Sequence, residues 1–128
     1  MPFRFDDSRY PLLVVHFEPV VTDADVQAQD GLVYPAFARM DRERRKGILL
    51  VNNAPDATLT ASQRKHIIDS NTLHRELMQR TCLGIGIVIH SAVQRGILTA
   101  LGWLMPSPTM NAFGSLVDAE RWAREKLG

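Results

Sequence analysis

The sequence predicts an α/β fold, in which a mixed sheet of about five strands carries about four helices. Two continuous apolar runs, residues 47–51 and 83–89, have the length of strands that are buried on both faces. Stretches with helical spacing of apolar residues separate these runs, and such alternation implies parallel strands joined by right-handed crossovers. The length of 128 residues corresponds to one domain, residues 1–128.

The N-terminal segment is expected to form a β-hairpin. Phe3 and Phe5 alternate with polar residues, as in a short edge strand, and residues 6–9 are typical of a turn. The apolar stretch of residues 11–17 then predicts the returning strand. The hairpin places one antiparallel pair beside the parallel strands.

A helix is predicted after the hairpin, beginning at the cap residue Thr22 and its acidic first turn. Apolar residues recur at helical spacing as far as Met40, and a basic run follows. Pro35 lies inside this pattern, where it removes a backbone donor and crowds the preceding turn. We therefore expect a kink, or two helices that meet between Gly31 and Pro35.

Three further helices are predicted. Thr60 and Gln63 have the spacing of a capping box, and the helix that they begin is expected to run to about Thr81. Another helix covers about residues 92–105. After a short strand within residues 107–113, Ser115 begins an amphipathic closing helix.

Composition indicates a soluble globular protein and excludes several classes of partner. Hydrophobic residues make up 45% of the chain and charged residues 23%, and the net charge is +1. That charge is too small to predict nucleic-acid binding. The single cysteine, Cys82, excludes an intrachain disulfide. Without an apolar N-terminal leader or a stretch long enough to span a membrane, we expect a cytoplasmic protein.

The order of elements and several phrases resemble the STAS/SpoIIAA-like superfamily, which includes anti-sigma-factor antagonists and the cytoplasmic domain of sulfate transporters. The phrases are "YPLLVVHF", "GILLVNN", "LTASQRKHI", "RGILTALGWL" and "MNAFGSLVDAERWAREKL". The resemblance implies a standalone STAS/SpoIIAA-like domain. In the antagonists a partner kinase phosphorylates a serine in a D-S-[ST]-G turn. Here the matching stretch is "APDATLTASQR", in which no acid-serine-glycine motif occurs, and Thr60 and Ser62, which fall near that place, are the candidate phosphosites.

Polar residues follow both predicted parallel strands. Because ligands meet such sheets at the carboxyl ends of the strands, these residues predict a rim for an anion or a partner protein. The alternative is that they only form turns and helix caps. The rim residues are Asn52, Asn53, Thr60, Ser62, His90, Ser91 and Arg95.

The predicted helix at residues 92–105 is apolar on almost all sides. Such a helix must bury a second face, either beneath residues 113–122 or against a homodimer partner, another protein or an acyl chain. The residues of this expected interface are Leu98, Leu101, Trp103 and Met105.

Enzymatic and metal-binding readings have little support in the sequence. His66 and His74 lie two helical turns apart, wider than the i, i+4 pair that zinc requires. No recognisable pair of nucleophile and base is present, so we expect no catalytic residues, no metal and no cofactor. The predicted function is a non-catalytic interaction or regulatory module whose partner is a kinase or another regulator. The alternative is a protein of the same fold that binds a small ligand or lipid.

Overall fold

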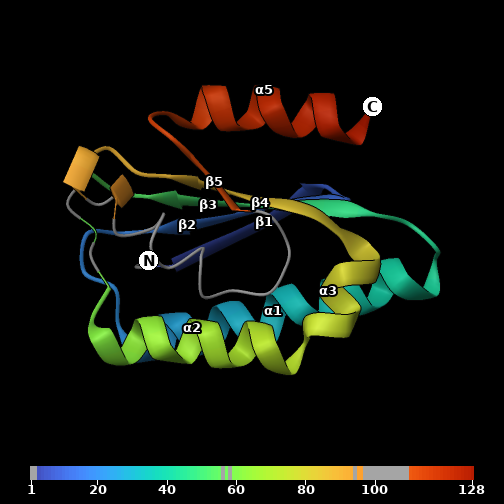
Figure 1. The fold of residues 1–128 in the computed structure, drawn as a ribbon, viewed down its shortest axis with the longest axis horizontal. Coiled ribbons are helices and arrows are strands. Elements are labelled where there is room, and N and C mark those ends of the chain that lie inside the picture. Colours follow the sequence, from blue (N-terminus) through green and yellow to red (C-terminus); the bar gives the residue numbers. More distant parts are fainter. Residues whose placement is uncertain (1–2, 56, 58, 94, 97–109) are drawn as a thin grey trace.

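A computed structural model describes residues 3–55, 57, 59–93, 95–96 and 110–128 of the chain. Figure 1 shows a sheet between two layers of helices, with α5 on one face and α1, α2 and α3 on the other. The elements, in chain order, are β1 (Phe3–Arg9), β2 (Leu12–Phe17), α1 (Asp23–Arg42), β3 (Gly47–Asn53), α2 (Ala61–Leu73), α3 (Arg75–Thr81), β4 (Cys82–Val88), β5 (Met110–Phe113) and α5 (Leu116–Leu127).

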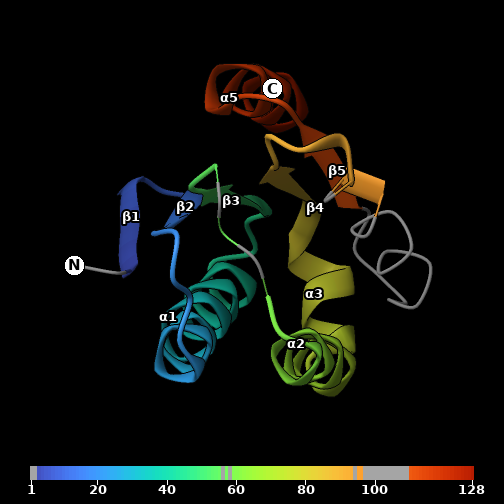
Figure 2. The same cartoon turned by 90° about the vertical axis from the view of Figure 1, so that its left-hand side faces the viewer.

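The five strands form one sheet in the order β1-β2-β3-β4-β5. β1 and β2 pair antiparallel, and every later neighbour pairs parallel. The predicted α/β class, the hairpin and the parallel strands are therefore confirmed. Figure 2, which views the sheet along its strands, shows α5 above β3 and β4, with α1 and α2 below the sheet.

The hairpin differs from the prediction in its turn. Residues 6–9 belong to β1, with a register irregularity between Asp6 and Arg9, and the chain reverses at Tyr10 and Pro11. The Asp6 carboxylate accepts hydrogen bonds from the Ser8 hydroxyl and the Ser8 backbone N–H. Such local bonds between an aspartate and the residue two positions later are typical of turns, which is why the sequence predicted one here. In the structure they lie at a bulge of the edge strand β1.

α1 is one unbroken helix of 20 residues, so the alternative of two helices is wrong. Because proline has no backbone N–H, Pro35 cannot donate the helical hydrogen bond to the Gly31 carbonyl. Val33 and Phe37, on either side of Pro35, are both buried against the sheet, and this burial keeps the two halves in one helix. The predicted N-terminus is confirmed, because Thr22 and Asp25 form a reciprocal capping box.

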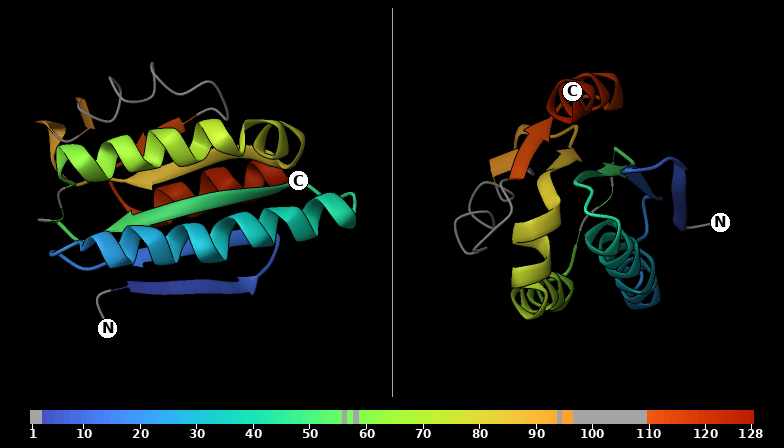
Figure 3. Two further views of the ribbon diagram at one scale, coloured as in Figure 1. Left: turned by 90° about the horizontal axis from the view of Figure 1, so that it is seen from below. Right: turned by 90° about the vertical axis from the view of Figure 1, so that its right-hand side faces the viewer.

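The predicted helix from Thr60 to Thr81 is divided at His74, which has φ −102° and ψ 19°. The Ser70 carbonyl accepts the His74 backbone N–H and lies 2.9 Å from its ring Nδ1, so the side chain competes with the helical bond. Leu73, the last residue of α2, is apolar but 80% exposed. Figure 3 shows α2 lying alongside α1 beneath the sheet, with α3 turning toward β4.

Two apolar layers hold the helices on the sheet. The larger joins α1 and α3 to one face, and the smaller joins Ala119 and Ala123 of α5 to the other. A Cβ at Gly86 would lie 3.0 Å from the Trp122 ring and 2.8 Å from Leu50, so α5 packs directly on bare backbone.

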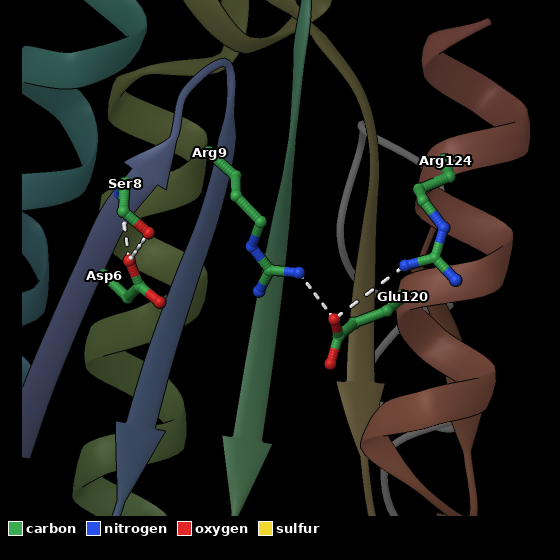
Figure 4. A network of polar contacts seen from close by, with 5 residues as sticks. All are labelled: Asp6, Ser8, Arg9, Glu120 and Arg124. Atoms are coloured by element: carbon green, nitrogen blue, oxygen red, sulfur yellow. Dashed lines mark hydrogen bonds and ion pairs between the residues drawn. The ribbon is translucent and has the colours of Figure 1, made fainter.

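α5 is also tied to the hairpin by charge. Arg9 of β1 reaches over the sheet to Glu120 of α5, 2.5 Å between Nη1 and Oε2, and Arg124 lies 4.0 Å from the same oxygen (Figure 4). Ser115 caps α5 by accepting the Asp118 backbone N–H, as predicted.

Candidate functional site

The carboxyl ends of β2, β3, β4 and β5 meet at one edge of the sheet. The register pairs Asn52 with both His16 and Val88, and pairs Val88 with Phe113. The helices α1, α2 and α5 all begin at this edge, on the left of Figure 1. We call the edge and its loops the carboxyl rim. It contains residues 18–22, the described residues of 52–62, residues 89–93 and 95–96, and residues 114–117.

The two predicted asparagines of the rim point to opposite faces of the sheet. Asn52 shares the α5 side with Leu50, and its amide Nδ2 lies 3.0 Å from His16 Nδ1. Asn53 shares the opposite side with Val51, and its amide donates to the Val88 carbonyl at 3.3 Å. The two side chains therefore do not form one polar patch.

Thr60 and Ser62 lie at the start of α2, on the lower side of the rim. The Thr60 hydroxyl accepts the Gln63 backbone N–H at 3.1 Å, and the Gln63 side chain accepts the Thr60 N–H at 3.0 Å, so the predicted capping box is confirmed. Both Thr60 and Ser62 are exposed. Their phosphorylation stays a prediction.

His90, Ser91 and Arg95 follow β4 at the same edge. His90 is exposed, and the Arg95 guanidinium donates to the Ile89 carbonyl at 3.0 Å. The Arg95 backbone N–H bonds the Ser91 carbonyl, which begins a helical turn. The chain thus brings both predicted polar loops to one edge, although their side chains face different directions. Their role as a binding rim stays a prediction.

Exposed valines are a feature of the rim that the sequence patterns did not single out. Among the described residues, five large hydrophobic side chains are exposed, and Val20, Val93 and Val117 of these lie on the rim. They follow β2, β4 and β5 respectively. All three valines thus belong to segments at one edge of the sheet, where their side chains are open to contact with another molecule.

His16 is a second rim residue that sequence reasoning missed. The Asn52 amide nitrogen can only donate, so His16 Nδ1 accepts and the ring is neutral with its proton on Nε2. Burial lowers the pKa of His16, and the Arg4 guanidinium opposite it in the hairpin lowers the pKa further. Parallel register places His16 beside Asn52, and that register could not be read from the sequence.

The protein is expected to lose stability at acidic pH through His16. Because the folded-state pKa lies below the ordinary value of 6.5, the unfolded chain binds more protons between these two values. The stabilisation is therefore complete above pH 6.5 and is lost as the pH falls through the folded-state pKa. Urea unfolding between about pH 7.5 and about pH 5 should show a weaker pH dependence for His16→Gln than for the wild type. Equal dependence would contradict this assignment.

A separate polar cluster joins α1 to α2. The Asp30 carboxylate accepts the Ser70 hydroxyl at 2.7 Å and lies 2.6 Å from His66 Nε2. Asp69, adjacent in sequence to Ser70, pairs instead with Lys65. The Ser70 hydroxyl also lies 3.4 Å from His66 Nε2, so the three side chains contact one another. The cluster is therefore a cross-link between helices.

Other expectations concern the cysteine, metals and the apolar helix. Burial raises the pKa of the Cys82 thiol to about 12, which keeps it protonated at neutral pH.

The described residues contain no group of three ligands that could hold a metal, and none of their helices has the length and apolarity of a membrane span. The predicted interface residues Leu98, Leu101, Trp103 and Met105 lie outside the described residues.

Comparison with known proteins identifies the fold. No protein-family model and no curated protein matches the chain. Among solved structures, an uncharacterised protein of the DUF3478 family from Shewanella loihica PV-4, which has a SpoIIAA-like fold, is similar with a TM-score of 0.65. The match covers 94% of this chain and 91% of that one, at 14% sequence identity. The protein described here has a SpoIIAA-like fold.

Proposed function

We propose that the protein is a non-catalytic interaction module that binds a regulatory protein through the carboxyl rim. The observation that carries this proposal is that three valines of the rim, Val20, Val93 and Val117, are 75%, 74% and 62% exposed. Burying such side chains against a partner removes apolar surface from water, at about 25 cal/mol per Å². The polar groups between them would give the interface its orientation.

The chemistry of the rim supports binding over catalysis. His16 is held by Asn52, and the Thr60 hydroxyl serves as a helix cap. His90 is exposed, as an interface side chain in the free protein would be. We propose a regulator or kinase as the partner, and a second copy of the chain as a further partner of the apolar segment at residues 97–105.

Charge substitutions on the rim should abolish partner binding and leave the fold intact. We expect wild-type protein, used as affinity bait in its own host, to retain a partner that Val93→Glu and Val117→Glu both lose. A carboxylate would be desolvated at the interface without a counter-ion, which costs several kcal/mol. Quantitative mass spectrometry of the retained proteins is the measurement, with circular dichroism to confirm folding.

Leu73→Glu is the matched control, because Leu73 is 80% exposed but ends α2, far from the rim. It introduces the same charge and should retain the partner. If all three variants retain the same proteins as the wild type, the rim is not the interface. Native mass spectrometry of the same preparations tests the alternative function, since a bound acyl chain or small ligand would appear as added mass.

A further inference from the structure

The C-terminus of α1 ends in a Schellman motif whose left-handed residue is an arginine. The Arg45 N–H bonds the Met40 carbonyl at 2.8 Å, and the Arg44 N–H bonds the Asp41 carbonyl at 3.2 Å. Arg44 has φ 56°, and among the described residues it is the only one other than glycine with a positive φ. Glycine usually occupies this position because a Cβ is unfavourable there. Arg44 therefore adopts a backbone conformation that is unfavourable for a residue with a Cβ.

The turn at residues 42–46, which we call the basic turn, carries cations without partners. Arg42, Arg44 and Lys46 are exposed, and the ion pairs of the described residues include none of the three. Residues 39–46 hold five basic and two acidic side chains, whereas the whole chain has a net charge of only +1. The positive charge is thus concentrated at this end of α1.

Both acids near the basic turn are already neutralised. Asp41 accepts two hydrogen bonds from Arg80, at 3.0 and 3.2 Å. Glu43 accepts the Tyr10 hydroxyl at 2.8 Å and Arg39 Nε at 2.9 Å. These contacts leave Arg42, Arg44 and Lys46 to face an external anion.

Tyr10 fixes two further guanidinium groups beside the turn. Arg39 lies 4.2 Å and Arg45 lies 5.0 Å from the centroid of its ring. Cation–π contacts of this kind hold arginines in place while their outer N–H groups remain available. A ligand that binds here meets cations that are partly ordered before it arrives.

We propose that the basic turn docks an acidic segment of a partner protein, whose carboxylates pair with Arg42, Arg44 and Lys46. The site lies at the opposite end of the sheet from the carboxyl rim, where α1 ends and β3 begins (Figure 1), and so it does not depend on the rim. Three exposed cations within residues 42–46 suit a short run of carboxylates.

Nucleic acid and membranes fit this surface less well. The whole chain has a net charge of only +1, which gives a long polyanion such as DNA little attraction to the rest of the molecule. Membrane attachment gains from apolar side chains beside the cations, and none of the exposed large hydrophobic residues of the described chain belongs to the basic turn. An acidic protein segment is the partner that remains.

Fluorescence anisotropy with fluorescein-labelled polyglutamate tests the proposal. Arg44→Gly removes one cation and relieves the backbone, so it should weaken binding about two- to fivefold while the Tm stays at or above that of the wild type. The triple variant Arg42→Gln, Arg44→Gly, Lys46→Gln should weaken binding about tenfold or more. Added salt should weaken wild-type binding.

Arg121→Gln is the charge-matched control, because Arg121 is an exposed arginine of α5. It should bind polyglutamate as the wild type does. Equal binding by wild type and Arg44→Gly, or an equal loss in Arg121→Gln, would overturn the proposal. Binding of a double-stranded DNA oligonucleotide or of vesicles containing phosphatidylserine, without binding of polyglutamate, would overturn the choice of partner.

Discussion

Gly47→Ala should lower the free energy of unfolding by about 3 kcal/mol, the upper part of the range for overpacked cores. A Cβ at this position would lie 2.4 Å from the Pro11 carbonyl oxygen and 2.6 Å from Met40 Sδ. The oxygen belongs to the backbone and accepts the Ile48 N–H at 3.2 Å, so it cannot move away without loss of that bond. Urea denaturation measures the loss directly.

Gly31→Ala adds the same methyl group and is expected to have the opposite effect. Gly31 is inside α1, and apart from its chain neighbours and the backbone of its own helix no atom lies within 4 Å of the added Cβ. Alanine should therefore raise the free energy of unfolding by about 0.5–1 kcal/mol through its helix propensity. If both variants unfold at the same urea concentration, the close approach at Gly47 does not limit packing.

Local sequence patterns predicted the elements of this fold where one physical signal dominated. The apolar runs that form β3 and β4 have the length and composition of buried strands. The spacing of Thr60 and Gln63 is typical of the start of a helix. The break of that helix at His74 was not predicted, because apolar residues on both sides of it continue the helical periodicity, although Leu73 faces solvent. Periodicity records residue type and not the packing that decides burial.

The candidate site could be predicted only to the level of an edge. Parallel pairing places the ends of β3 and β4 together, and the structure has them there. It could not be foreseen that Asn52 and Asn53 diverge, or that His16 lies beside Asn52, since both depend on register. The positive φ of Arg44 could not be predicted from the sequence either, because arginine has no preference for the left-handed region.

Gln63→Ala should lower the free energy of unfolding by about 2–3 kcal/mol, because it leaves buried polar groups without partners. Gln63 is 4% exposed, and its amide nitrogen donates to the Val21 carbonyl at 2.9 Å and to the Asp23 carboxylate at 3.1 Å. Its oxygen accepts the Thr60 N–H. One side chain thus joins the beginnings of α1 and α2 at the carboxyl rim. Without it, the Val21 carbonyl and the Thr60 N–H lose their partners.

Two further variants separate the cross-link from the helix cap. Gln63→Glu keeps an acceptor for the Thr60 N–H but loses the donor to Val21 and places a second carboxylate beside Asp23. If the cross-link dominates, this variant should unfold as easily as Gln63→Ala; if only the cap matters, it should match the wild type. Gln27→Ala, at an exposed position of α1, should change stability by less than about 0.5 kcal/mol. Hydrogen exchange at the first amides of α2 should rise with the loss of stability, because the rim is where the two helices would separate.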